Sequence, residues 1–238
     1  DALNVGKLKM LVIDEADVML SGDFKSQVAS IVRELPLTTQ FCCFSATLSS
    51  EVLETTSKFM NDPVKILMPP QKVTLEGIKQ YYLDAESEEL KFECLCNVYE
   101  RVSIDQAIIF ANKIEKVEWL AQEMTTKHFT VGVIHGEMDQ NERNSIMRDF
   151  RKGNTRVLIA TDVIARGIDV QQVSLVINYE LPLDHANYIH RIGRTGRFAR
   201  KGTAINLLKK QEYQSMKKIE RFYGIKDLKD LPYEVDNL

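Results

Sequence analysis

Four residues near the end of the chain carry its densest cationic chemistry. His190, Arg191, Arg194 and Arg197 lie in the run HRIGRTGR, with one arginine at every third position. On a helix, that spacing would set the three guanidinium groups along one edge. Because arginine donates two parallel hydrogen bonds and keeps its charge, such an edge could grip a terminal phosphate. A solvated basic helix end is the alternative interpretation.

Acidic residues follow a short apolar run near the start of the chain. Residues 8–13 lead directly into Asp14, Glu15 and Asp17. A buried parallel strand would deliver these carboxylates to its carboxyl end. There, Asp14 could hold Mg²⁺ through water, and Glu15 could orient and deprotonate an attacking water molecule. A solvated turn would explain the same residues without chemistry.

Two further polar segments follow apolar runs. Ser45 and Thr47 could hydrogen-bond back to the acids, or they could cap the helix that follows them. Thr161 offers a hydroxyl group to a phosphate, with Arg166 as a nearby cation and Asp169 as an acceptor for a ribose hydroxyl. A polar loop between a strand and a helix is the alternative for this second segment.

Strands and helices are predicted to alternate along the chain. We expect strands at residues 8–13, 40–44, 64–67, 78–83, 107–110, 130–134, 156–160, 174–177 and 204–207. We expect helices at residues 23–35, 50–60, 88–99, 115–125, 140–151, 185–193 and 211–223. This alternation is typical of an α/β fold with parallel, doubly wound sheets, which bind ligands at the carboxyl ends of their strands.

The predicted elements fall into two units. Residues 1–68 form the first unit, residues 69–77 a linker that begins with two prolines, and residues 78–238 the second. The first unit has only three predicted strands, and no phosphate-binding G-x-x-x-x-G-K-[ST] sequence occurs in the chain. We therefore expect the chain to begin in the middle of a domain.

Composition indicates a globular protein. The 238 residues are 44% hydrophobic and 27% charged, and no apolar run approaches the ~18 residues of a membrane span. The N-terminus has no secretory pattern, so we expect an intracellular protein without a membrane segment. The four cysteines have no zinc-site spacing and are predicted to be buried, reduced thiols.

Charge is distributed unevenly along the chain. The net charge is −3, which argues against a generic nucleic-acid binder. Residues 1–105 carry 10 Lys and Arg against 17 Asp and Glu, whereas residues 106–238 carry 21 against 17. The two parts of the chain therefore have different electrostatic roles or different origins.

Taken in order, the motifs resemble those of the DEAD-box RNA helicases, and the resemblance covers essentially the whole chain. The segments that carry it are Asp14-Glu15-Ala16-Asp17, Ser45-Ala46-Thr47, Gln140-x-x-Arg143, Ala165-Arg166-Gly167-x-Asp169 and His190 to Arg197. Residues 73–80 and 165–179 look most like the initiation factor 4A branch.

The resemblance implies two RecA-like parallel-sheet lobes, the first only partly present here and the second complete. Such lobes close on ATP and single-stranded RNA and unwind short duplexes, and ATP hydrolysis resets them. The resemblance further implies a role in translation initiation, a helical-repeat scaffold of the initiation factor 4G type as a partner, and a cytoplasmic location, with a nuclear one possible.

The resemblance also implies roles for single residues. Asp14 and Glu15 match the magnesium-holding and water-activating acids. The catalytic or nucleotide-binding positions of the second lobe are Gly167, Asp169, His190, Arg194 and Arg197. The residues that couple the nucleotide to RNA are Asp17, Ser45 and Thr47. The positions along the RNA backbone are Asn112, Gly136, Arg143, Thr161 and Arg166.

Two functions remain open at this point. The first is an ATP-dependent RNA helicase of which this chain, without a phosphate-binding loop, is an inactive piece. The second is a non-catalytic module that binds RNA, or a helical-repeat scaffold, through its more basic part.

Overall fold

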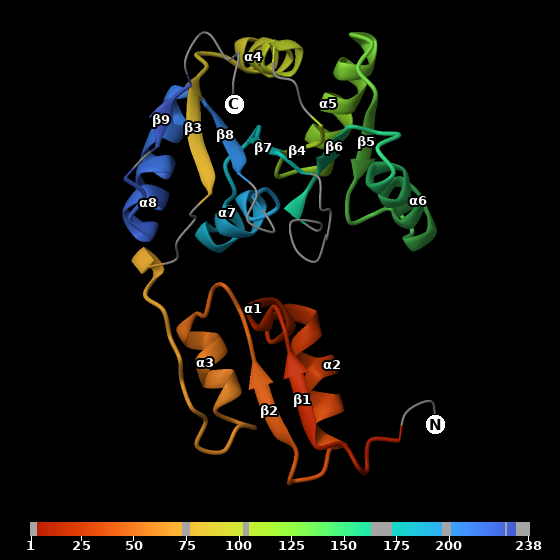
Figure 1. The fold of residues 1–238 in the computed structure, drawn as a ribbon, viewed down its shortest axis with the longest axis vertical. Coiled ribbons are helices and arrows are strands. Elements are labelled where there is room, and N and C mark those ends of the chain that lie inside the picture. The colour runs from red at the N-terminus through yellow and green to blue at the C-terminus, as the bar shows by residue number, and fades with distance from the viewer. Residues whose placement is uncertain are drawn as a thin grey trace. The chain divides into compact units, whose positions relative to one another are not determined.

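The computed structural model describes residues 4–72, 77–101, 105–162, 173–196, 201–226 and 228–231. The chain divides into two compact units, residues 1–69 and 70–238. Each unit contains parallel strands and helices, which confirms the predicted α/β class (Figure 1).

The first unit is built on two parallel strands. Strand β1 (Met10–Ile13) pairs with β2 (Gln40–Cys43) in the register Met10↔Gln40 to Ile13↔Cys43. Three helices accompany the strands: α1 (Ala16–Met19), α2 (Gly22–Arg33) and α3 (Ser50–Thr56). Strands and helices share one small buried cluster, made of Ile13, Ala16, Leu20, Val28 and Val52.

Two predictions for the first unit were wrong. Residues 64–67 form no strand, and Val64 and Ile66 are 91% and 86% exposed. An apolar alternation makes a strand only where a neighbouring strand takes up its backbone hydrogen bonds, and none of the described strands pairs with this segment. Strand β1 is buried on one face only, since Met10 and Val12 are 49% and 54% exposed.

The second unit is built on a seven-stranded parallel sheet with the order β5-β6-β4-β7-β8-β3-β9. Its strands are β3 (Ile78–Asp84), β4 (Ala107–Phe110), β5 (Val131–Ile134), β6 (Val157–Ala160), β7 (Leu175–Asn178), β8 (Gly202–Leu208) and β9 (Lys229–Asp230). Every residue of β4, β6, β7 and β8 is buried. These central strands are mostly apolar, as is typical of strands whose two faces are both covered.

The helices of this unit are α4 (Glu88–Arg101), α5 (Ile114–Thr126), α6 (Gln140–Arg151), α7 (His185–Ile192) and α8 (Tyr213–Tyr223), with short 3₁₀ turns at Pro70–Lys72 and Lys210–Glu212. Helices α4 and α5 share one buried cluster with the central strands, α6 covers a second, and α7 and α8 pack in a third. Figure 1 shows α6 beside β5 and α8 beside the other end of the sheet.

Sequence periodicity predicted the strands and helices of the second unit to within a few residues, and residues 107–110 and 140–151 are confirmed as β4 and α6. Strand β9 was missed because it has two charged residues, which give no periodic signal. The last predicted helix begins as a 3₁₀ turn. All four cysteines are free, as predicted, but only Cys96 is buried. Among the described helices, none has the length and apolar character to cross a bilayer.

Candidate functional site

The predicted acids lie directly after β1. Asp14 is exposed, and its Oδ1 accepts a hydrogen bond from the backbone N–H of Glu15 at 2.9 Å. Glu15 has the left-handed backbone conformation φ 51°, ψ 44°, which is strained for a residue with a side chain. Ala16 N–H donates to the Phe44 carbonyl at 2.9 Å and so ties this turn to the end of β2. Strain of this kind is typically kept at functional positions.

Asp17 receives both hydroxyl groups of the Ser45–Thr47 segment. Ser45 Oγ donates to Asp17 Oδ1 at 2.6 Å, and Thr47 Oγ1 donates to Asp17 Oδ2 at 2.9 Å. The predicted hydrogen bonds back to the acids are thereby confirmed for Asp17. The capping alternative is wrong, because Ser49 caps α3 by accepting from the Val52 N–H at 3.3 Å.

In the second unit, three neighbouring strands bring polar residues to one edge of the sheet. Strands β5, β6 and β4 are adjacent, and Ile134 and Phe110 both pair with Ala160 at their carboxyl ends. The residues that follow these ends, or that begin the helix after β5, form what we call the polar edge: Asn112, His135, Gly136, Arg143 and Thr161. The sheet topology thus gathers residues that are separated by up to about fifty positions in the sequence.

Helix α6 begins at this polar edge because its N-cap fixes it there. Asp139 Oδ1 accepts hydrogen bonds from the N–H groups of Asn141 and Glu142, at 2.7 and 3.0 Å. This cap satisfies two of the amide groups that a helix leaves open at its start. It places Arg143 in the first turn of α6.

Three side chains of the polar edge contain buried polar atoms that have no hydrogen-bond partner in the described part of the chain. The atoms are Thr161 Oγ1, Arg143 Nε and His135 Nδ1. Thr161 is 7% exposed, while its backbone N–H is satisfied by the Ile134 carbonyl at 3.3 Å. A buried polar atom without a partner costs about 1–3 kcal/mol, so such atoms at one edge point to a ligand that supplies their hydrogen bonds.

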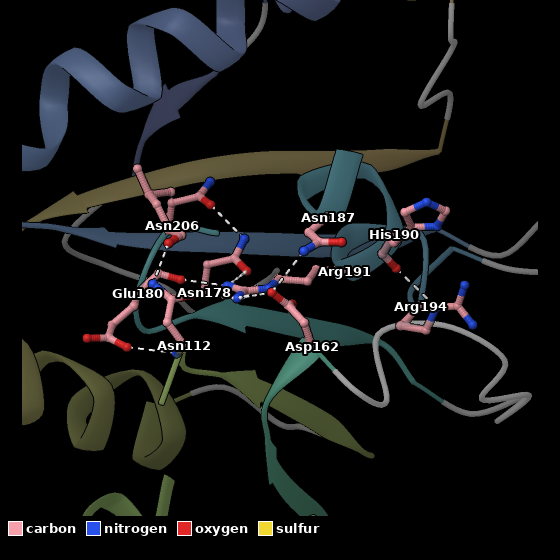
Figure 2. Close-up of polar contacts among 10 residues, drawn as sticks. Asn112, Asp162, Asn178, Glu180, Asn187, His190, Arg191, Arg194 and Asn206 are labelled. Carbon is pink, nitrogen blue, oxygen red and sulfur yellow. Dashed lines mark hydrogen bonds and ion pairs between the residues drawn. The ribbon is translucent and has the colours of Figure 1, made fainter. Parts of the chain in front are cut away.

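Arg191 is buried beneath the same strand ends, with no exposed side-chain surface (Figure 2). Its Nε and Nη2 donate to the Asp162 carboxylate at 2.5 and 3.0 Å. Nη1 donates to the Glu180 carbonyl at 2.6 Å and to Asn178 Oδ1 at 3.3 Å, and Nη2 also donates to Asn112 Oδ1 at 2.8 Å. All five N–H groups of the guanidinium therefore have acceptors.

The polar contacts continue across the sheet. Asn178 and Asn206 are register partners on β7 and β8, and the Asn178 amide donates to Asn206 Oδ1 at 2.8 Å. Asn206 in turn donates to the Tyr81 carbonyl at 3.0 Å, and Tyr188 Oη donates to Gln80 Oε1 at 2.8 Å. A satisfied chain of this kind fixes the positions of its members, because any displacement would leave a buried group unpaired.

The predicted edge of three arginines on one helix is wrong. Helix α7 ends at Ile192, so Arg194 lies beyond it, and its Nε donates to the His190 carbonyl at 3.1 Å. Figure 2 shows the Arg191 side chain directed at Asp162 and Asn178, while His190 and Arg194 point away from that cluster. The remaining predicted site residues, Arg166, Gly167, Asp169 and Arg197, lie outside the described part of the chain.

A second ionic cluster of this unit joins α4 to the end of β8. Lys91 has no exposed side-chain surface and donates to Glu212 Oε2 at 2.8 Å, and burial lowers its pKa. Burial raises the pKa of Glu88, but hydrogen bonds from Lys116 and Lys209 outweigh burial and lower it to about 2. Among the described residues, Lys91 and Glu88 bond to each other's neighbours and not to the polar edge, so this cluster has the character of a structural ion pair network.

Comparison with known proteins identifies the family. Residues 1–55 match the family described as DEAD/DEAH box helicase, and residues 90–199 match the helicase conserved C-terminal domain. The chain is 53% identical over 236 residues to the ATP-dependent RNA helicase FAL1 of Candida albicans, and 52% identical over 232 residues to the ATP-dependent RNA helicase eIF4A of the same organism. The chain belongs to the DEAD-box family of RNA helicases.

Solved DEAD-box structures agree with this assignment. The chain matches Saccharomyces cerevisiae Dbp5 bound to RNA and ADP BeF3 with a TM-score of 0.91 at 36% identity, over 97% of this chain and 61% of that one. It also matches the C-terminal domain of Dbp5 with a TM-score of 0.62 at 38% identity, over 67% of this chain and 92% of that one. Such neighbours confirm the RecA-like character of the fold.

The DEAD-box relatives are longer than this chain. The alignment with FAL1 spans 99% of this chain and 59% of FAL1. The alignment with eIF4A spans 98% of this chain and 58% of eIF4A.

The sequence reasoning missed the residues that hold Arg191. Asp162, Asn178, Glu180 and Asn206 were assigned no role, although they are its direct partners or the next link of the chain. A signal was available: Asn178 closes an apolar run, and Asn206 interrupts another. An amide on a buried strand needs a polar partner, so such residues predict a hydrogen-bonded network.

Proposed function

We propose that this chain is part of an ATP-dependent RNA helicase of the initiation factor 4A type. It would bind single-stranded RNA along the sugar-phosphate backbone and act in unwinding short duplexes. Residues 1–68 would be the C-terminal part of the first RecA-like lobe, residues 69–77 the linker, and residues 78–238 the second lobe. Family membership supports this division, as do the two compact units at 1–69 and 70–238.

The observation that carries the RNA-binding part is the set of unpartnered buried atoms on the polar edge. Thr161 offers a hydroxyl group and Arg143 a cationic N–H, and neither Thr161 Oγ1 nor Arg143 Nε has a hydrogen-bond partner among the described residues. A phosphate oxygen or a ribose 2′-hydroxyl would satisfy both groups. Gly136, which is exposed and follows the end of β5, would let a backbone approach closely. Contacts of this kind make binding independent of base sequence.

The nucleotide would bind to the acids of the first unit and the cations of the second. Carboxylate oxygens are the protein ligands that Mg²⁺ prefers, and the exposed Asp14 fits the role of holding the ion through water. The ion would neutralise charge on the transferring phosphoryl group. Glu15 would orient and deprotonate the attacking water. The cationic and nucleotide-side residues would be Gly167, Asp169, His190, Arg194 and Arg197, and Asp17, Ser45 and Thr47 would couple the two ligands.

RNA binding is tested by a salt titration of the chain with a fluorescent single-stranded oligouridine. The logarithm of affinity falls with the logarithm of salt concentration by about 0.7 for each phosphate neutralised on a single strand. We expect Arg143→Gln to weaken binding and to reduce that slope by about 0.7. Arg148→Gln is the matched control, since Arg148 is an exposed cation of the same helix that contacts Ser145 Oγ at 3.2 Å.

Equal slopes for the wild type and Arg143→Gln would contradict the RNA-binding role of the polar edge. A slope that falls equally in Arg143→Gln and Arg148→Gln would show that any basic residue of α6 attracts the oligonucleotide, and that outcome too would contradict a specific site.

The ATPase part has its own test. We expect this chain alone to show no RNA-stimulated phosphate release, because none of its 238 residues form the G-x-x-x-x-G-K-[ST] cradle that stabilises the transferring phosphoryl group. Phosphate release above background that disappears in Glu15→Gln would contradict this expectation.

A second candidate function is a non-catalytic module that binds RNA or a helical-repeat scaffold of the initiation factor 4G type. The excess of positive charge in residues 106–238, and the position of the whole polar edge in that part, favour it. Affinity for oligouridine that does not fall as salt rises would remove its basis, because counterion release would not drive binding.

A further inference from the structure

We propose that Arg191 is a positioning residue of the RNA-binding edge, which holds Asn112 and the strand end after Thr161 in place without touching RNA. This inference rests on the proposed function of the polar edge. It differs from the role that the sequence pattern suggested for Arg191, which was to line up with Arg194 and Arg197 as a phosphate contact.

The hydrogen bonds of Arg191 exclude direct phosphate contact in this arrangement. Its five N–H groups are used by Asp162, Asn112, Asn178 and the Glu180 carbonyl. Its guanidinium also lies 5.2 Å from the centre of the Phe110 ring, within cation–π range. A phosphate could gain a donor from Arg191 only by displacing one of these buried acceptors, which would then lose its partner.

The same bonds fix two ends of the polar edge. Asp162 directly follows Thr161, and its carboxylate takes two bonds from Arg191 and one from Asn187 Nδ2 at 3.1 Å. Asn112 Oδ1 accepts from Arg191, while its Nδ2 donates to the Leu181 carbonyl at 2.9 Å. The side-chain orientation of Asn112 and the backbone path after β6 therefore depend on one guanidinium.

Arg191 also connects the polar edge to helix α7. Helix α7 carries His190 and is followed by Arg194, the two described residues proposed for the nucleotide side. Asn187 of the same helix shares the Asp162 carboxylate. A displacement of the strand end at Asp162 would thus be transmitted to α7, because separating the pair would leave the fully buried Arg191 guanidinium without its carboxylate.

A lysine cannot reproduce this arrangement. Its ammonium group is a single point with three donors, whereas Arg191 reaches acceptors that follow β6, β4 and β7 through three separate nitrogen atoms. Arg191→Lys keeps the charge opposite Asp162 but gives up most of the contacts to Asn112, Asn178 and Glu180. It is the variant that separates charge from positioning.

The test is the oligouridine salt titration of the chain carrying Arg191→Lys. We expect affinity at fixed salt to fall by about 10-fold to 100-fold, on the scale found when residues that orient a binding group are lost. We expect the salt slope to stay at the wild-type value, because no phosphate contact is removed. Arg143→Gln should lower the slope in the same series, so the two kinds of residue give different signatures.

Two further variants exclude a merely structural effect. Lys91→Met removes another fully buried cation of the same unit, one that binds Glu212 and lies outside the polar edge. We expect it to lower the urea midpoint but to leave RNA affinity unchanged. Asp162→Asn should weaken RNA binding like Arg191→Lys, and the double variant should be no worse than the stronger single one, because both residues act through one contact.

The outcomes distinguish the inference from the proposed function. If the wild-type chain shows no salt-dependent affinity for oligouridine, the proposed function fails and the inference fails with it. If the wild type binds and Arg191→Lys binds equally well, or loses slope as Arg143→Gln does, only the positioning role is overturned. A loss of affinity in Lys91→Met equal to that in Arg191→Lys would also overturn it.

Discussion

The two units use polar residues at strand ends in opposite ways. In the first unit, Asp17 is half-buried and takes two hydroxyl bonds, from Ser45 and Thr47, beside a two-stranded sheet. In the second, Arg191 is fully buried beneath a seven-stranded sheet and makes five bonds. Water can therefore replace the lost bonds of Asp17 more readily than those of the Arg191 side chain, which has no exposed surface.

The difference shows what a polar residue can do at each place. A half-buried carboxylate can exchange protein hydroxyl groups for other partners at low cost, which suits a residue whose contacts change during a reaction cycle. A fully buried guanidinium cannot exchange partners without a large penalty, which suits a residue that holds other residues still. The following experiments examine that contrast in order of expected effect.

Replacing the buried cation should have the largest effect. We expect Arg191→Met to lower the free energy of unfolding of the second unit by about 3–5 kcal/mol, because it removes two of the three bonds of the Asp162 carboxylate and the guanidinium donor of three other acceptors. Urea unfolding followed by Trp119 fluorescence measures this unit selectively, since Trp119 is the one tryptophan of the chain. A loss below ~1 kcal/mol would mean that water reaches these acceptors.

The second-largest effect should be a difference in amide hydrogen exchange between the two units. We expect the amide protons of β1 and β2 to exchange at least about a hundredfold faster than those of β4 and β6, a difference of about 3 kcal/mol in opening free energy. The reason is that β4 and β6 are buried throughout, whereas Met10 and Val12 on β1 are about half exposed. Mass spectrometry of exchanged peptides gives the comparison, and equal protection would contradict it.

Replacing the half-buried Asp17 carboxylate should have a smaller effect on stability. We expect Asp17→Ala to destabilise the first unit by about 1 kcal/mol, because solvent can satisfy the released hydroxyl groups of Ser45 and Thr47. Faster exchange in peptides covering β1 and β2, with no change in Trp119 unfolding, is the expected result. Asp17→Asn keeps the shape of the side chain and should have a smaller effect.

The smallest effect concerns acid stability in the second unit. Hydrogen bonds from Lys116 and Lys209 hold the pKa of Glu88 at about 2, below its ordinary value of about 4.5. The folded state is therefore favoured above pH ~4.5, and this contribution is lost as the pH falls from about 4.5 toward 2. Glu88→Gln should flatten the pH dependence of the urea midpoint in that range. An unchanged pH dependence would show that other carboxyl groups dominate.

Sequence periodicity predicted the second unit well because its strands are short, continuous apolar runs between amphipathic helices. The same reasoning failed at residues 64–67, where alternating apolar residues found no neighbouring strand. Periodicity describes which residues prefer burial, but a strand also needs a partner for its backbone hydrogen bonds, and the partner is a property of the whole sheet.

The motifs, read in order, were enough to indicate the family, which the comparisons confirm. Spacing alone suggested that Arg191 and Arg194 share one edge of a helix, but the helix ends between them, at Ile192. No local pattern could say that Arg191 turns inward, because its acceptors come from residues 11 to 79 positions away.

By itself, the sequence determined the kinds of chemical groups present and the alternation of strands and helices, because both depend on residue type and local spacing. Only the tertiary structure decided which groups meet. Strand order brought Asn112, Gly136 and Thr161 to one edge of the sheet. Burial directed Arg191, one arginine of a basic motif, toward the residues that hold this edge in place. The physical reason is that hydrogen-bond satisfaction in a buried core is settled by neighbours in space, which local spacing does not specify.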